Sequence, residues 1–396
     1  MIKMHFVLLL MSLFFLTSCK DFFGKKTDLS FIDIPKYDNQ LVAFIPIQPV
    51  LSNFVKPTDI TAGYDELLYV VDEGTNEIIS MDQTGKILSR FFLKGVKKVV
   101  QDRKLNLLVI ADFDTVVNSV NFTLSAIYRI QLDPNNYSLQ FAKIVKKIIH
   151  PFYFRSSFAS FDAQVKFNGI GLLADGSYYV TRTGPNNSTT QFGGPNDAII
   201  YFNSKDEYQY YIVMNTETGT SSDYFKQPFG IVTLAQPPQS PFVNTSNNFY
   251  FSSIDPNLSL KVQAIQATKT EDGVDYSLIT NQILGDTSKA DGFLYTANRF
   301  KQPRGLAYSG DGTNYLFVTD SELDSVYVFT NSGLEGVRPP AGAESKKFIK
   351  VSFGGTGSAP TQFKKPLGLT FYRKILYVCD SENQRILRFR LTTDFN

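Results

Sequence analysis

The sequence predicts an all-β fold in which six copies of one structural unit close into a ring. The chain of 396 residues is rich in aromatic residues (21 Tyr, 35 Phe), and only 19% of its residues are charged. Short segments alternate apolar and polar residues with a period of two, which marks strands with one buried face. One pattern of motifs recurs between residues 54 and 391, and such repeats must stack on one another to bury their apolar faces.

Composition also limits what the protein can bind and catalyse. The formal net charge is +2, which gives no reason to expect nucleic acid or a strongly anionic membrane surface as a partner. His5 and His150 are the only histidines, which argues against a His-rich zinc site and against any mechanism that needs two histidines. The sequence predicts no cofactor and no catalytic residue.

The first 18 residues have the pattern of a signal peptide. Lys3 precedes an apolar run from Phe6 to Leu16, which is too short to span a bilayer comfortably. The run ends in Leu16-Thr17-Ser18-Cys19, which resembles the lipobox of bacterial lipoproteins. The resemblance implies that residues 1–18 are removed and that Cys19 carries lipid. The alternative is an ordinary secretory signal in which this cysteine is incidental.

The lipoprotein interpretation assigns the remaining segments. Residues 19–38 become a lipidated tether, and residues 39–396 form the repeat domain. The protein is then a membrane protein of the bacterial cell envelope, held by its lipid anchor and facing either the periplasm or the outside. Cys379 is left without a partner, and we expect a small buried hydrophobe there, since neither His nor Lys flanks it to stabilise a thiolate.

Six copies of the repeat can be aligned. Each strong copy runs from Phe-x-x-Pro through a short apolar stretch and a polar turn to a strand ending in Asp, followed by an alternating strand. The strong copies are residues 54–82, 300–329 and 363–390; the weaker ones begin at residues 96, 165 and 225.

This pattern resembles the NHL repeat, a family of β-propeller blades. The best match is Pro366-x-Gly368-Leu369, then Tyr377-Val378-Cys379-Asp380, then Asn383-x-Arg385-Ile386. The resemblance implies a six-bladed β-propeller, with seven blades as an alternative if residues 266–299 hide an unmatched copy. Asp59 and Lys98 replace the glycine in the first two copies, which weakens the transfer of any family function.

Individual positions fit this architecture. Gly305 and Gly368 suit crowded inner strands near the axis. The aspartates that end the second strands are expected to accept hydrogen bonds from backbone amides of the next turn, and so to be structural turn caps; they are Asp72, Asp112, Asp320 and Asp380.

The ring also needs a strand from the other end of the chain. The last copy supplies only three strands, and residues 40–48 (QLVAFIPIQ) are predicted to complete the last blade as its outer strand, which removes an exposed edge. Outer strands of the other blades are predicted at residues 86–92, 139–145, 208–214 and 347–353.

Four insertions interrupt the repeats, at residues 146–164, 183–197, 235–248 and 331–345. Loops on a rigid scaffold commonly carry binding, and the Gly/Asn/Ser/Thr-rich segment 183–197 is either such a loop or a tolerated surface insertion. His150, in the first insertion, is expected to be packed or solvated and not to be a ligand.

Propellers bind ligands at the mouth of the central channel, so the resemblance implies a site there. Cations gather at the predicted mouth: Lys56, Lys97, Arg182, Lys226, Lys301, Arg304 and Lys364. Acidic residues follow the second strands: Asp72, Glu73, Asp114, Glu322, Asp324 and Glu382. Such a mouth favours an anionic or polar ligand, or the acidic surface of a partner. Alternatively, each lysine pairs with its acidic neighbour and the face binds nothing.

Three functions remain open. The first is a lipid-anchored binding scaffold for a protein or glycan partner at the envelope. The second is a metal-dependent hydrolase of the lactonase type, for which Asp59 and Asn168 are weak candidate ligands because hard cations need convergent oxygens. The neighbouring cations Lys97, Lys98 and Arg304 oppose a metal. The third is a structural subunit of a larger envelope complex.

Overall fold

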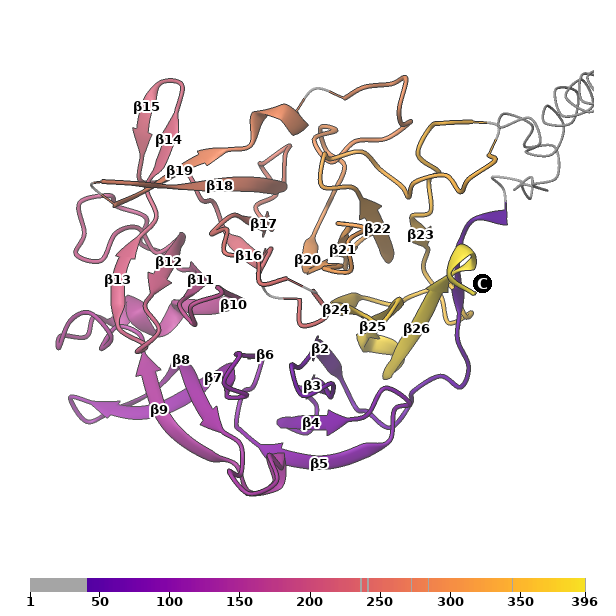
Figure 1. Cartoon of the computed structure of the whole chain (residues 1–396). Helices are drawn as coiled ribbons and strands as arrows, with labels where there is room; N and C mark the ends of the chain where they lie inside the picture. The colour runs from indigo at the N-terminus through magenta and orange to yellow at the C-terminus, as the bar shows by residue number, and fades with distance from the viewer. Residues whose placement is uncertain are drawn as a thin grey trace, which may run out of the picture.

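The chain folds as a six-bladed β-propeller (Figure 1). This is a computed structural model, which describes residues 41–395 except residues 236, 241, 272, 284 and 344. Over these residues six sheets surround a central axis, so the predicted fold class is confirmed. The predicted signal peptide, the tether and Cys19 lie outside the described residues and stay predictions. None of the described helices is long and apolar enough to cross a membrane.

Each blade contains consecutive antiparallel strands, of which the inner strand comes first. The first three blades contain β2 (Pro57–Ala62), β3 (Leu68–Asp72), β4 (Glu77–Met81) and β5 (Ile87–Phe92); β6 (Lys98–Gln101), β7 (Leu107–Val117), β8 (Val120–Gln131) and β9 (Lys143–Ile149); and β10 (Lys166–Leu172), β11 (Tyr178–Thr183), β12 (Ala198–Phe202) and β13 (Tyr208–Tyr211).

The other three blades follow the same plan, and the fourth has two extra strands. They contain β16 (Pro228–Thr233), β17 (Phe249–Ser253), β18 (Val262–Thr270) and β19 (Gly273–Leu278) with β14 (Met214–Thr216) and β15 (Gly219–Ser221); β20 (Pro303–Tyr308), β21 (Leu316–Asp320), β22 (Ser325–Phe329) and β23 (Phe353–Gly354); and β24 (Pro366–Tyr372), β25 (Ile375–Asp380) and β26 (Arg385–Leu391) with β1 (Phe44–Pro46).

The N-terminal strand closes the last blade, as predicted. β1 runs antiparallel to β26, with Phe44 opposite Leu391 and Pro46 opposite Phe389. The buried Phe44 ring stacks on Phe353 at 6.0 Å between centroids and meets Phe317 edge-on at 5.9 Å. Because the two ends of the chain share one sheet, the last blade has no three-stranded stub with a free outer edge.

Residues 266–299 do not hide a seventh blade. Their first part completes β18 and supplies β19, which pair with each other inside the fourth sheet. Farther on, Leu294 and Tyr295 pack between the fourth and fifth blades together with Phe300. The stretch therefore fills a gap between two blades.

The outer strands differ from the prediction in three places. Residues 139–141 form the 3-10 helix η2 (Leu139–Phe141), and β9 begins only at Lys143. Residues 347–353 contribute only the start of β23, because Ile349 pairs with Val337 and not with β22. In residues 208–214, β13 ends at Tyr211, and Met214 pairs in parallel with Tyr276 of the next blade. The strand predicted at 86–92 is present as β5.

The apolar core is divided among the interfaces between blades. Six clusters of buried side chains each join the faces of two neighbouring sheets. Cys379 lies in the cluster between the last and first blades, where burial raises the pKa of its thiol. Near the axis there is no room for side chains at the predicted glycines: a Cβ on Gly305 would lie 2.2 Å from the Leu367 carbonyl oxygen, and one on Gly368 2.5 Å from the Asp59 Cα.

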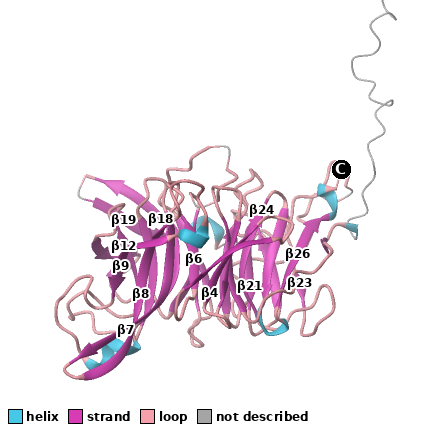
Figure 2. Ribbon diagram, turned by 90° about the horizontal axis from the view of Figure 1, so that it is seen from below, coloured by secondary structure: helices cyan, strands magenta, loops and turns pink. Residues whose placement is uncertain are grey.

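The propeller has two different faces, shown edge-on in Figure 2. The inner strands begin at the face that we call the mouth face, where Pro366 lies opposite Asp380. The β7–β8 hairpin extends beyond the other strands at this face (Figure 2). The opposite end we call the far face. The first and last described residues lie there, since Thr392 exchanges hydrogen bonds with Ala43 and donates one to the Leu41 carbonyl.

The described residues of the insertion 235–248 close the far end of the channel. They cross the centre of the ring (Figure 1), and the Gln239 amide bonds backbone groups of Ser309, Phe371 and Arg373 in the fifth and sixth blades. On the other side, the Ala235 carbonyl accepts bonds from Tyr64 and Arg103 of the first two blades. The central channel is therefore accessible from the mouth face.

Candidate functional site: the channel mouth

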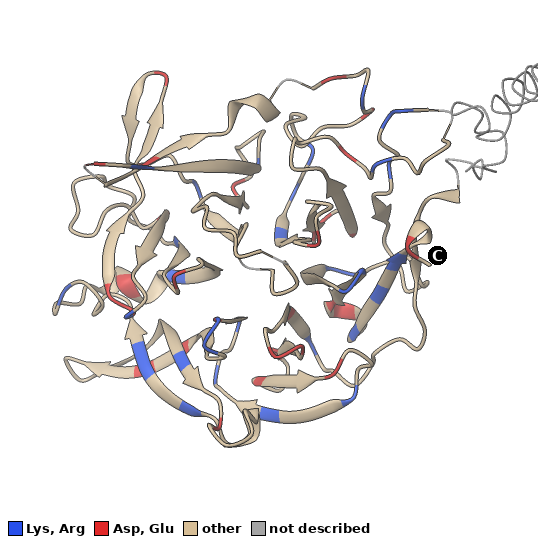
Figure 3. Ribbon diagram, viewed as in Figure 1, with Lys and Arg blue, Asp and Glu red and all other residues tan. Residues whose placement is uncertain are grey.

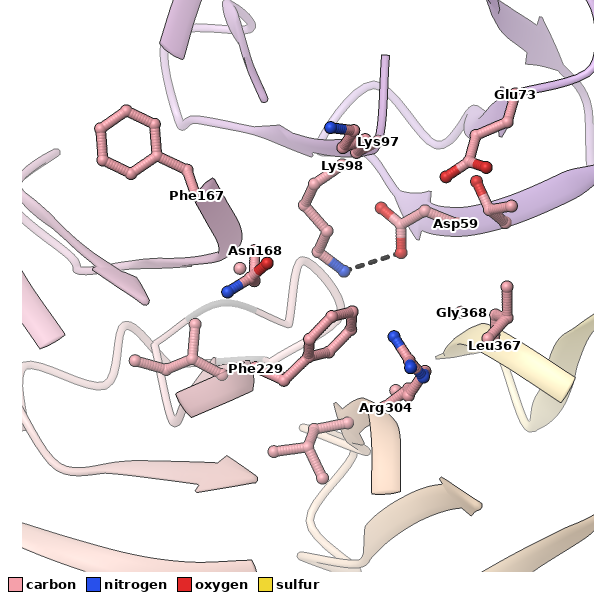
Figure 4. Close-up of a pocket in the computed structure, with 16 residues that line it drawn as sticks. Asp59, Glu73, Lys97, Lys98, Phe167, Asn168, Phe229, Arg304, Leu367 and Gly368 are labelled. Carbon is pink, nitrogen blue, oxygen red and sulfur yellow. Dashed lines mark hydrogen bonds and ion pairs between the residues drawn. The ribbon is translucent and has the colours of Figure 1, made fainter. Parts of the chain in front are cut away.

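A pocket of about 240 Å³ lies at the mouth of the channel and receives residues from all six blades (Figure 4). Most of its walls are the first residues of the inner strands, because these strands all begin at the mouth face and surround the axis. Below the pocket lies a second, smaller cavity of about 30 Å³, and Pro237 and Pro238 of the closing loop line it. The pocket is thus a blind cup.

The floor of the cup is an ion pair between neighbouring blades. The Lys98 Nζ lies 2.7 Å from Asp59 Oδ1, and the other oxygen of Asp59 accepts the Val99 amide at 3.0 Å. The Asp59 side chain is 3% exposed and that of Lys98 20%. Both residues occupy the position where other blades carry glycine, and their side chains join the first two blades through this ion pair.

Arg304 projects into the cup from the fifth blade, and no carboxylate of the described residues pairs with it. Its Nη2 donates to Gln302 Oε1 at 2.8 Å, its Nε is buried and has no hydrogen-bond partner, and its guanidinium lies over the Phe229 ring at 4.6 Å. Burial lowers the pKa of this guanidinium, and the charges of Glu73 and Asp320 only partly oppose that effect. The two pocket lysines differ in this respect, since Lys98 and Lys97 each pair with a carboxylate.

The remaining walls combine apolar surface with hydrogen-bond acceptors. Phe229 and Leu367 line the cup beside Arg304. Asn168 donates its amide to Thr183 and to the Pro228 carbonyl, which leaves its Oδ1 without a partner among the described residues (Figure 4). Glu73 reaches the cup from the β3–β4 turn, with one carboxylate oxygen 2.8 Å from Lys56.

The seven predicted mouth cations lie in three places: two line the pocket, four stand on its rim, and Arg182 is buried elsewhere. Lys97 and Arg304 line the pocket. Four lysines stand on the rim, each paired with a nearby acid: Lys56 with Glu73, Lys226 with Asp223, Lys301 with Glu322 and Lys364 with Glu382. Figure 3 shows acidic and basic positions interspersed around the ring. At the rim, the structure therefore has the lysine–acid pairing that was the alternative to a cationic ligand surface.

Arg182 does not reach the mouth. Its side chain is fully buried and donates to Tyr153 Oη and to the carbonyl oxygens of Gly193, Pro195 and Asn196. The strand ends with the side chain turned toward the insertion 183–197, because the carbonyls of that loop offer acceptors that the apolar interior lacks. Arg182 holds the loop in place.

Three of the four predicted caps accept backbone amides. Asp72 accepts from Val55, Lys56 and Gly74, and Asp320 accepts from Lys301 and Gln302. Asp380 accepts from Lys364, and Arg385 pairs with its other oxygen. Asp112 differs: its carboxylate binds Lys97 Nζ at 3.1 Å. The second copy lacks the Phe-x-x-Pro approach of the strong copies, so its chain arrives along another path.

The metal candidates are engaged elsewhere. Both oxygens of Asp59 are occupied, by Lys98 and the Val99 amide, and Asn168 faces the cup with a single oxygen. The described residues contain no group of three or more His, Cys, Asp or Glu side chains that could hold a metal ion.

His150 lies outside the cup in a buried cluster. Its Nε2 is 3.1 Å from Asp162 Oδ1, and Arg155 reaches the same oxygen at 2.5 Å. Burial lowers the pKa of His150 to about 4, against the opposing effect of Asp162. The residue is packed, as predicted.

Sequence reasoning missed Phe229 and Leu367. Each stands between the Pro and the Gly of a Pro-x-Gly motif, as Arg304 does. The signal was present: one position of the repeat faces the cup in successive blades, so reading that position around the ring would have found them.

Comparisons with known proteins identify the fold. No protein-family model and no curated protein match the sequence. An auxiliary nutrient binding protein from Bacteroides thetaiotaomicron is similar in structure, with a TM-score of 0.50 at 13% identity over 90% of this chain and 74% of that one. A luciferin-regenerating enzyme has a TM-score of 0.50 at 9% identity over 88% and 95% of the two chains. A structural genomics protein of unknown function from Bacteroides thetaiotaomicron has a TM-score of 0.50 at 13% identity over 88% of this chain and 75% of that one. At these identities the likeness concerns the propeller fold alone.

Proposed function

We propose that the protein is a lipid-anchored binding module of the bacterial cell envelope that holds an anionic group of a protein or glycan partner in its channel mouth. The blades are of the NHL type in this proposal, on the motifs of residues 366–386. A binding protein and an enzyme both appear among the similar structures, and function belongs to sites more than to folds. The argument therefore rests on the cup.

Arg304 carries the proposal. A partly buried guanidinium with an orphan Nε and no carboxylate within ion-pair distance among the described residues has lost solvation without gaining a direct ion pair. Such a group is costly, and a bound anion that accepts its hydrogen bonds would offset the cost. The paired lysines on the rim offer no comparable vacancy.

The orientation of the faces suits an anchored receptor. The described chain begins at Leu41 on the far face, bonded to Thr392. An anchor attached to the preceding residues would place the far face toward the membrane and the open cup away from it, where a partner can reach it. The closed far end agrees with a single approach direction.

The metal-dependent hydrolase is the second candidate, and the occupancy of Asp59 disfavours it. A metal would have to displace Lys98 before it could bind that carboxylate.

Cross-linking in cells tests the binding proposal. The tagged full chain is cross-linked and its partners are identified by mass spectrometry, in parallel with Arg304→Met and with Arg373→Met as matched control. Arg373 also lies over a ring, that of Tyr372, but pairs with Glu66 on the far face. We expect a dominant partner that Arg304→Met loses and Arg373→Met retains. A partner retained by both variants would exclude the cup. Cys19→Ser should release the protein from the membrane fraction; retention there would contradict the lipid anchor.

A further inference from the structure

We infer that the cup receives a single sugar residue bearing one carboxylate, at the end of a glycan. This inference rests on the proposed binding function and names the chemical class of its ligand. Four features of the cup support it: its charge, its donor geometry, its free acceptors and its size.

The charge of the cup fits a monoanion. Three cations line it, Lys97, Lys98 and Arg304, and two carboxylates, Asp59 and Glu73. The sum is one positive charge. A carboxylate neutralises this charge, whereas a phosphate dianion would meet Asp59 and Glu73 with an excess negative charge in a partly desolvated site, where like charges repel strongly.

The donor geometry fits a planar carboxylate beside a ring. A guanidinium presents parallel N–H groups that match two carboxylate oxygens. The Nη1 of Arg304 has no hydrogen-bond partner among the described residues, its Nη2 donates only to Gln302, and its guanidinium carbon lies 4.6 Å from the centre of the Phe229 ring. A ligand held at this guanidinium therefore also contacts Phe229 and Leu367, which provide apolar surface for the C–H face of a sugar ring.

The free acceptors fit hydroxyl groups. Asn168 Oδ1 has no partner among the described residues, and one oxygen of Glu73 is left over from its pair with Lys56. Both belong to the lining of the cup. A sugar ring offers several hydroxyl donors to such acceptors. The C-terminus of a peptide offers one backbone amide next to its carboxylate, which leaves more of these acceptors unpaired.

The size of the cup fits one residue at the end of a chain. Its volume of about 240 Å³ is below the ~300–1,000 Å³ of pockets that enclose drug-sized ligands. The closing loop blocks passage through the channel, so a polymer cannot thread it. Only a terminal residue can enter.

Calorimetry with matched ligands tests this inference on the full chain in detergent. The ligands are methyl glucuronide and methyl galacturonide, the neutral methyl glucoside and galactoside, glucose 6-phosphate, and an acetylated tripeptide with a free C-terminus. We expect a uronide to bind and its neutral counterpart, the phosphate and the peptide to bind at least tenfold more weakly. Arg304→Met should weaken uronide binding roughly 10–100-fold, the range for a hydrogen bond to a charged group. Arg373→Met should not change it.

A second variant guards against a folding defect. Leu367→Glu adds a negative charge to the cup wall and should also weaken uronide binding while leaving the melting temperature within a few degrees. Equal affinity for a uronide and its neutral counterpart would overturn the role of the carboxylate. Arg304-dependent binding of the peptide in place of the uronides would overturn the sugar, and Arg304-dependent binding of glucose 6-phosphate in their place would overturn the carboxylate; both results would leave the binding function standing. No Arg304-dependent ligand, together with no Arg304-dependent partner in cells, would overturn both.

Discussion

Lys98 and Asp59 form an ion pair between the inner strands of the first two blades, beside the central axis, with Lys98 Nζ and Asp59 Oδ1 2.7 Å apart. Asp59 also accepts the Val99 amide, so this one carboxylate links the inner strands of the first and second blades. In the fifth and sixth blades a Cβ at the corresponding positions, Gly305 and Gly368, would clash with a neighbouring backbone. The pair therefore joins the first two blades at the repeat position where the fifth and sixth blades have close backbone contact.

Removing one member of this pair should destabilise the propeller. Asp59→Leu leaves the Lys98 ammonium without a partner in the channel, which should lower the free energy of unfolding by about 2–4 kcal/mol. Urea unfolding measures the change. In the double variant Asp59→Leu/Lys98→Met, part of the loss should be regained. A double variant less stable than Asp59→Leu would show that the ion pair is not the cause.

Metal ions should leave the stability of the protein unchanged. Asp59 is engaged by Lys98 and Val99, so millimolar Ca²⁺ or Mn²⁺ finds only single oxygens of Asn168 and Glu73, in a cup that three cations also line. Ligands that bind only the folded state raise its melting temperature, and we expect no such rise by scanning calorimetry. A rise that Asp59→Leu abolishes would support the hydrolase.

Ring closure should depend on Phe44. Its ring is 5% exposed and contacts Phe317 and Phe353, so Phe44→Ala should cost about 3–5 kcal/mol in unfolding free energy. Ile45→Ala is the matched control, because Ile45 lies on the same strand and is 39% exposed; it should cost less than about 1 kcal/mol. Similar losses of unfolding free energy in both variants would mean that backbone pairing of the strand, and not the Phe44 side chain, closes the propeller.

Stability should fall with pH below about 6.5 because of His150. Its folded-state pKa of about 4 lies below the ordinary 6.5, so protonation favours the unfolded chain and stability is lost as the pH falls from 6.5 toward 4, by about 3 kcal/mol in full. Asp162 and Arg155 face the imidazole, Arg182 lies near it, and the Tyr153 ring packs on it.

The pH 5–6.5 window separates His150 from its partner Asp162. Because burial dominates the shift of the histidine, His150→Gln should flatten the dependence of the unfolding free energy on pH in this window. The pKa of Asp162 is lowered, so its own contribution is lost only at more acidic pH. An unchanged slope in the variant would assign the effect to another group.

Arg182 should control the order of the insertion 183–197. Arg182→Met removes the donors for the carbonyls of Gly193, Pro195 and Asn196. Amide hydrogen exchange in this loop should speed up at least tenfold, because the loop loses its fixed contacts with the blade. Lys226→Met removes only an exposed pair and should leave the loop protected. Equal exchange in the two variants would contradict an anchoring role.

The blade repeats were predictable because they are local. Motifs such as Pro366-x-Gly368 and the strand-ending Asp380 fix turns and strand faces within one copy. The site was predictable in part: Arg304 and Lys97 stand at repeat positions that meet near the axis. Arg182 was misplaced because its direction depends on acceptors in an insertion, which carries no repeat pattern.

By itself, the sequence determined the repeating blade pattern, the strand that closes the ring and the crowding at Gly305. Each follows from periodicity and short-range sterics. Only the tertiary structure decided which charges are neutralised. Lys56 and Arg304 look alike as basic residues before or at an inner strand, yet one pairs with Glu73 and the other faces the cup unpaired. The reason is that ion pairing depends on distances between side chains of different turns and blades, which arise only when the ring closes.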